Sequence, residues 1–130
     1  GLCYLSFCPK EQRDTLLDML AKSKEPGNQP AKNRKKVYET LVETRKRGYA
    51  IWHRKRRVAD ETSLAVPIIV EDRLLASLTM RFASTAVPEA DAIARFVPKL
   101  RKTAQEIAAE FIRQHQRDPI ATTIAPRDTD

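Results

Sequence analysis

The sequence predicts one α+β domain in which helices flank an antiparallel β-sheet. Three observations lead to this fold class. The chain reads as two helices, then three strands, then one helix. The strands are joined by links too short for the crossover that parallel strands need, so neighbouring strands run antiparallel. A chain of 130 residues also has the size of a single domain built around one core.

The first predicted helix begins at Pro9, because a missing N–H costs nothing in a first helical turn. Its apolar face consists of Leu16, Leu17, Met19 and Leu20. The Pro26–Pro30 segment contains Pro, Gly and Asn and predicts a loop. A second helix is expected from Ala31 to Arg47, because Arg45–Arg47 complement the negative helix end and Gly48 suits a left-handed cap.

Three strands are expected next, at Tyr49–Trp52, Ser63–Val70 and Leu74–Phe82. Pro67 should lie at a sheet edge or a bulge, because it cannot donate to a strand ladder. Alternation divides the third strand into two faces: Leu74, Ala76, Leu78, Met80 and Phe82 on one, and Leu75, Ser77, Thr79 and Arg81 on the other.

The turn between the last two strands sets their register. A three-residue turn at Glu71–Arg73 would pair Val70 with Leu74 and carry Ser63 opposite Arg81. Four polar side chains then share one face: Ser63, Ser77, Thr79 and Arg81. Such convergent donors suit small-ligand recognition, and the same pattern also fits an ordinary solvent-facing surface.

The last predicted helix begins at Pro88 and runs to about Gln116, with Pro98 as a kink or the start of a second piece. Its expected packing face is Phe96, Leu100, Ala104, Ile107 and Phe111. Periodicity is lost after that, so residues 1–117 are predicted to form the domain and residues 118–130 a disordered tail.

The composition and the start of the sequence argue against a membrane-spanning or secreted protein. Hydrophobic residues make up 42% of the chain, yet no run approaches the roughly 20 apolar residues of a membrane span. The first residues, Gly1–Phe7, lack the features of a secretory signal and are apolar enough to suggest a piece of a longer protein. Cys3 and Cys8 fit neither a redox motif nor a zinc site, so two thiols in a reducing, cytoplasmic compartment are expected.

Catalytic machinery is not evident in the sequence. It contains no nucleophile elbow, zinc-protease motif, P-loop or dinucleotide fingerprint. His53 and His115 are interpreted as surface histidines, and the carboxylate pairs Glu39/Glu43 and Glu106/Glu110 lie on exposed helix faces. We therefore expect a non-catalytic domain with no metal and no cofactor.

The formal net charge of +7 leaves a second interpretation open. The densest basic cluster, Arg54–Arg57, could contact phosphates in a nucleic-acid-binding module. Over the whole chain the 24 basic and 17 acidic residues are mostly interspersed, as on an ordinary solvated surface.

Five segments resemble the isocitrate-lyase-regulator (IclR) family of bacterial transcription factors, in the family's order and spacing. They are Gly1–Pro9, Arg47–Ala50, Ser63–Pro67, Leu75–Thr79 and Pro88-Glu89. The resemblance covers residues 1 to about 115 and is closest to MhpR-like regulators of aromatic acid catabolism.

The resemblance implies a GAF-like effector-binding domain, part of a homodimer or homotetramer that binds DNA through an N-terminal winged helix-turn-helix absent from this chain. Carried over position by position, the ligand-binding residues are Gly1, Leu2, Trp52, Ser63, Thr79 and Arg81.

This chain departs from the family pattern at three of these places. Trp52–Lys55 replaces a frequent acidic run, Ser63 a frequent cysteine and Arg81 a serine. The larger, cationic set favours an organic anion with an aromatic or longer body over a small oxo acid. Two structural roles also stay open: Trp52 as a plain core anchor, and Arg81 in a salt bridge to Asp60 or Glu61.

Overall fold

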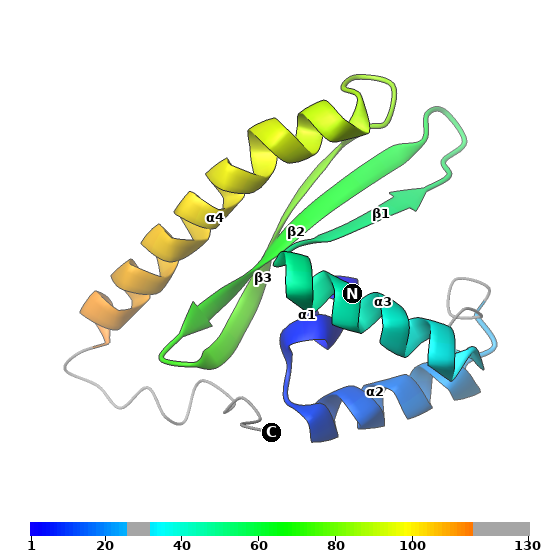
Figure 1. The fold of residues 1–130 in the computed structure, drawn as a ribbon, viewed down its shortest axis with the longest axis horizontal. Coiled ribbons are helices and arrows are strands. Elements are labelled where there is room, and N and C mark those ends of the chain that lie inside the picture. Colours follow the sequence, from blue (N-terminus) through cyan, green and yellow to red (C-terminus); the bar gives the residue numbers. More distant parts are fainter. Residues whose placement is uncertain (26–31, 116–130) are drawn as a thin grey trace.

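The computed structural model describes residues 1–25 and 32–115 and confirms the α+β class (Figure 1). Its elements are α1 (Leu2–Phe7), α2 (Lys10–Lys22), α3 (Arg34–Arg47), β1 (Ala50–Arg54), β2 (Glu61–Val70), β3 (Arg73–Ala83) and α4 (Glu89–Gln114). The strands form one antiparallel sheet in the order β1-β2-β3. The predicted loop at Pro26–Pro30 and the predicted tail at 118–130 lie outside the described residues.

Helix α1 is an element that the sequence did not predict. It is formed by the apolar segment at the start of the chain, and its N-cap Gly1 makes no side-chain capping hydrogen bond. A helix this short depends on tertiary contacts rather than on its own propensity. Ser6 stabilises it locally by donating from Oγ to the Leu2 carbonyl at 2.7 Å.

Helices α2 and α3 follow the predicted start and stop signals. Pro9 is the N-cap of α2. Helix α3 begins at Arg34, three residues after the predicted start, and the Asn33 side chain accepts the backbone N–H of Lys36 there. At its other end Gly48 has φ +85° and caps the helix in the left-handed conformation, as expected.

The β2–β3 turn differs from the prediction, yet the register beyond it is the predicted one. The turn has two residues, Glu71 and Asp72, with φ of 50° and 63°, so Val70 pairs with Arg73 rather than with Leu74. A bulge between Ile68 and Ile69 of β2 then leaves one extra residue on β3. The turn is one residue shorter than predicted and the bulge adds one residue to β3, so Ser63 still pairs with Arg81 as predicted.

Because of the bulge, Leu74 and Leu75 lie on the opposite faces of β3 from those predicted. Leu74 packs with Cys3 and Ala65, on the side of the sheet opposite to Ala76 and Leu78. The extra residue, Leu75, packs with the same cluster as Ala76. The bulge thus places Leu74 on the face that carries the polar residues of β3.

Pro67 sits where it removes no ladder hydrogen bond with β1. Strand β1 pairs with β2 only as far as the Ala50–Ala65 pair, so Pro67 lies beyond that edge and next to the bulge. The position agrees with the rule that proline in a sheet occupies an edge or a bulge.

Helix α4 covers one face of the sheet, which we call the α4 face (Figure 1). The core there includes Leu64, Val66, Val97 and Ala104, supported by the half-buried Phe96 and Leu100 that the sequence predicted. The prediction was wrong for Ile107, which is 37% exposed, and Phe111 stacks on His115 rather than on the sheet. Pro98 lies inside one continuous helix.

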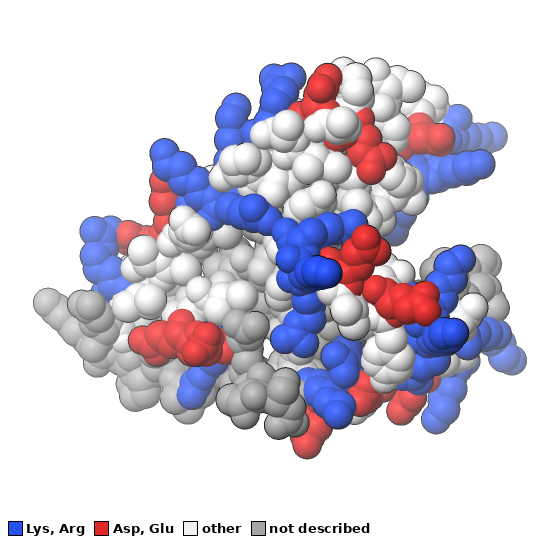
Figure 2. Space-filling view, viewed as in Figure 1, with Lys and Arg blue, Asp and Glu red and all other residues white. Residues whose placement is uncertain are grey.

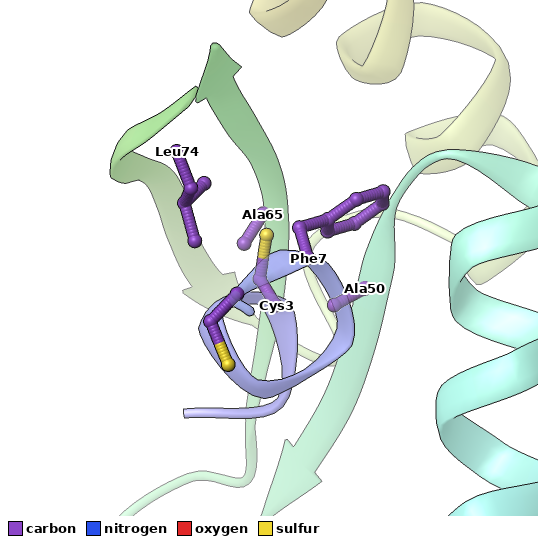
Figure 3. Close-up of a cluster of buried hydrophobic side chains, with 6 residues drawn as sticks. Cys3, Phe7, Ala50, Ala65 and Leu74 are labelled. Carbon is purple, nitrogen blue, oxygen red and sulfur yellow. The ribbon is translucent and has the colours of Figure 1, made fainter. Parts of the chain in front are cut away.

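Helix α1 packs on the opposite face, which we call the α1 face, and α3 packs on α1 (Figure 1). Figure 3 shows Cys3 and Phe7 of α1 directed toward Ala50, Ala65 and Leu74 of the three strands. The alanines allow the short helix to approach the strands closely, because they carry no more than a methyl group.

One arginine joins elements on the two sides of the sheet. Arg101 of α4 donates from Nη2 to the Arg47 carbonyl at the end of α3, at 2.7 Å. Arg47 itself donates to the Tyr49 carbonyl and lies over the Tyr49 ring. The C-terminal end of α3 is therefore tied to α4 beside the start of β1.

Candidate functional site

Three of the predicted site residues form one row across the α1 face. Trp52 of β1 pairs with Ser63 of β2, and Ser63 pairs with Arg81 of β3. In the next row Thr79 pairs with Ala65 on the same face, because residues two apart in a strand share a face. We call Trp52, Ser63, Thr79 and Arg81 the polar strip.

The start of α1 lies beside the polar strip. Leu2 and Trp52 both pack against the cluster that contains Cys3 and Ala50. An ideal Cβ built on Gly1 would meet no atom within 4 Å, so the space next to this backbone is open. The structure thus packs Leu2 and Trp52 on the same cluster and leaves room at Gly1.

The residues of the polar strip differ in solvent exposure, from buried on β2 to exposed on β3. Ser63 is 3% exposed, Trp52 is half-buried, and Thr79 and Arg81 are exposed. The strip is therefore a surface that a ligand can reach from the β3 side, with its closed end at the centre of the sheet.

Arg81 makes no salt bridge among residues 1–25 and 32–115, so the predicted alternative of an ion pair with Asp60 or Glu61 was wrong. Glu61 is engaged by Arg56, with Nη2 and Oε2 3.4 Å apart, and the Asp60 carboxylate accepts the Arg56 backbone N–H. The Arg81 guanidinium keeps its donors available for an external acceptor.

Beyond Thr79 on the α1 face, Ser77 lies beside Cys3 of α1. The sequence placed Ser77 on this face but did not predict α1, so it could not place Cys3 there. The Ser77 hydroxyl is buried and makes no hydrogen bond of ordinary geometry within the described residues; the Cys3 thiol is the group it interacts with. Burial raises the pKa of that thiol, and the Ser77 hydroxyl opposes the effect only in part.

His53 is exposed, as the prediction of a surface histidine requires, and it also makes contacts within the structure. Its Nδ1 lies 3.1 Å from Thr62 Oγ1, which in turn lies 2.8 Å from Ser84 Oγ. Its Nε2 lies 3.4 Å from Glu89 Oε2 at the start of α4. These contacts tie β1 to β2 and α4 on the α4 face, and none of them reaches the polar strip.

The basic cluster Arg54–Arg57 is exposed and runs from the last residue of β1 into the connection to β2. Arg56 is already paired with Glu61. On the face drawn in Figure 2, Lys and Arg side chains run across the middle, with groups of Asp and Glu side chains beside them. The nearby carboxylates reduce the positive potential that a nucleic-acid groove uses.

The described part of the chain lacks the features of a metal site and of a membrane-spanning helix. It holds no group of three or more His, Cys, Asp or Glu side chains placed to bind a metal ion. None of its helices combines the length and apolar character that crossing a bilayer requires.

Three solved structures to which this chain is similar belong to transcriptional regulators. The chain is similar to the inducer-binding domain of the PobR transcription factor from Acinetobacter, a double mutant in complex with 3-hydroxybenzoic acid. The TM-score is 0.66 at 22% identity, over 83% of this chain and 63% of that one. No protein-family model matches the sequence.

Two other regulators share the fold. A transcriptional regulator from Rhodococcus matches with a TM-score of 0.66 at 18% identity, over 85% of this chain and 45% of that one. An IclR family transcriptional regulator from Brucella abortus matches with a TM-score of 0.64 at 19% identity, over 85% and 41%.

The predicted effector-domain fold is thereby confirmed, and these neighbours are regulators rather than enzymes. The chain spans between 41% and 63% of the length of the solved chains that it matches.

Proposed function

We propose that this chain is the effector-binding domain of an IclR-type transcriptional regulator and that it senses an organic, aromatic acid. The row Trp52–Ser63–Arg81 is the observation that carries the proposal, because it places an aromatic surface, a buried hydroxyl and a guanidinium side by side. A fold shared with regulator domains supports the same function.

The chemistry of the row suits a carboxylate on an apolar body. A guanidinium presents a planar fork that can give a carboxylate two parallel hydrogen bonds. Ser63 and Thr79 add neutral hydroxyl groups, and Trp52 and Leu2 offer apolar surface for a ring. The exposed position of Arg81 allows the acid group to enter from the open side of the strip.

The effector would act by shifting the populations of two quaternary arrangements of a homodimer or homotetramer. Control of DNA binding through an N-terminal winged helix-turn-helix, a cytoplasmic location and membership of the MhpR-like branch belong to the same proposal. An effector must bind one arrangement more tightly than the other, since equal affinity shifts no equilibrium.

The test is calorimetry of the full-length regulator with a panel of aromatic and aliphatic acids, beginning with 3-hydroxybenzoate. Arg81→Ala should weaken binding of a carboxylate effector at least about 30-fold, because truncating one partner of such a pair typically costs about 2–5 kcal/mol. Lys55→Ala, a change of an exposed cation outside the strip, should leave the affinity unchanged.

Arg81→Lys separates charge from geometry. It retains the charge but loses the fork, so intermediate affinity is expected. The proposal would be contradicted if wild type and Arg81→Ala bound the carboxylate effector with equal affinity, or if the neutral amide bound more tightly than the acid. Steeply salt-dependent, sequence-independent binding of duplex DNA by residues 1–130 would also contradict it, because it would favour a nucleic-acid-binding module at Arg54–Arg57.

A further inference from the structure

A second concave surface lies away from the polar strip, between α1 and α3. We call it the α1–α3 groove, and its lining residues are Leu2, Leu5, Asn33, Lys36, Val37, Thr40 and Leu41. Its volume of about 470 Å³ is in the range of small-ligand sites, which are mostly apolar with a few polar groups.

The lining has an apolar part and one free cation. Leu41 is buried, and Leu2, Leu5 and Val37 are half-buried. The two neutral polar side chains are engaged with the α3 backbone. The Asn33 Oδ1 accepts the Lys36 N–H at 3.3 Å, and the Thr40 hydroxyl donates to the Lys36 carbonyl at 3.0 Å.

The charge of Lys36 is not neutralised within the described residues, since no ion pair involves it there. The neighbouring groove on the outer side of α3 is different, because it contains Lys35 and Lys46 together with Glu39 and Glu43. Within the described residues no ion pair joins these lysines to these carboxylates, so the two grooves differ in the carboxylates of their lining and not in ion pairing. Of the two grooves, only the one facing α1 has a cation and no carboxylate in its lining.

The helix end adds to the positive potential of this groove. The first turn of α3 has no acidic residue and begins with Arg34, Lys35 and Lys36. Cations at the positive end of a helix dipole are unfavourable, and an anion there is favourable. Arg34 is paired with Asp18, which leaves Lys36 as the charge that faces the α1–α3 groove.

We propose that the α1–α3 groove binds an amphipathic carboxylate with an aliphatic chain. The chain lies along Leu5, Val37 and Leu41, and the carboxylate lies at the Lys36 ammonium. The proposal does not depend on the polar strip, because none of the four strip residues lines the groove; of the predicted ligand-binding residues, the groove lining contains Leu2.

The experiment is an NMR and calorimetric titration of the 130-residue chain with sodium octanoate. Saturable shifts of the Leu5 and Val37 methyl signals are expected. Lys36→Ala should weaken binding about fivefold, the size of effect that a partly exposed ion pair produces. Lys35→Ala is the matched control, since it removes the adjacent lysine that lines the other groove, and it should leave binding unchanged.

Two further measurements test charge and place. Octylammonium, with the same chain and the opposite charge, should not bind at the groove. Thr40→Phe, at an exposed position on the groove lining, should block octanoate without disturbing the core.

The proposal is overturned if octylammonium binds as well as octanoate, or if Lys36→Ala and Lys35→Ala have equal effects. It is also overturned if sedimentation shows that a second copy of the chain closes the groove. Arg81→Ala should leave octanoate binding intact, so failure of the effector proposal would be seen separately.

Discussion

The two faces of the sheet are built from the same three strands and have different properties. On the α4 face, Leu64 and Val66 are almost fully buried under one long helix. On the α1 face, the alternating residues Ser63 and Ala65 lie beneath a six-residue helix that leaves Arg81 exposed. Alternation along a strand therefore lets one face hold the fold together while the other keeps polar groups available for recognition.

The largest expected effect tests this division directly at two adjacent residues. Leu64→Ala should lower the free energy of unfolding by about 3 kcal/mol, because Leu64 is 0% exposed and its loss leaves a cavity. Ser63→Ala, one residue away on the other face, should cost less than about 1 kcal/mol. Equal losses in urea denaturation would show that the α1 face contributes as much to stability as the α4 face.

The next effect concerns the connection between the two sides. Gly48→Ala should cost about 1–2 kcal/mol, since φ is +85° and an L side chain is disfavoured in that conformation. The new Cβ would also lie 2.8 Å from Nη2 of Arg101. In an Arg101→Ala background the contact is absent, so the cost of Gly48→Ala should fall to the backbone part alone. An unchanged cost there would mean that Arg101 moves aside freely.

A smaller effect is expected toward the end of α4, where the helix extends past the core. Phe111→Ala should cost no more than about 1 kcal/mol, because Phe111 stacks on His115 with ring centroids 4.2 Å apart and lies outside the clusters on the sheet. Phe96→Ala, which removes a ring packed against Phe82, should cost at least about 2 kcal/mol more in the same assay. The reverse order would place the helix packing at its C-terminal end.

The smallest effect has the opposite sign. Ser77→Ala should leave the free energy of unfolding unchanged or raise it by up to about 1 kcal/mol, because the buried hydroxyl that it removes has only the Cys3 thiol, a weak hydrogen-bonding group, beside it. Ser6→Ala, on α1 above the same face, removes a made hydrogen bond to the Leu2 carbonyl and should cost about 1 kcal/mol. A clear loss for Ser77→Ala would indicate that this hydroxyl is satisfied in solution.

The elements that sequence reasoning predicted well are those with local chemical signals. Gly48 ends α3 because its left-handed conformation suits glycine, and Pro9 and Pro88 precede α2 and α4 as helix N-caps. The predicted pairing of Ser63 with Arg81 is present, although the three-residue turn from which it was derived is not, because the bulge offsets the shorter turn. Whether these residues bind a ligand stays a prediction.

The elements that were missed depend on contacts distant in sequence. The α1 segment is too short and too uniformly apolar for its periodicity to distinguish helix from strand. Glu71-Asp72 lacks the glycine that usually marks a two-residue hairpin turn, so the turn was assigned three residues. The face on which Leu74 lies was predicted wrongly because it depends on a bulge, and no residue type in this hairpin marks the position of that bulge.

The bulge between Ile68 and Ile69, whose extra residue lies on β3, affects how homologous sequences can differ in length. Leu75 is the residue that the ladder does not pair, so a homologue lacking it would keep Ala76 opposite Ile68 and every later pair in place. Strand β2 contains no such spare residue between Ser63 and Pro67. A one-residue deletion there would turn Ser63 toward α4 and separate it from Arg81. Gaps in an alignment of this fold are thus compatible with the polar strip in one strand of the hairpin and incompatible with it in the other.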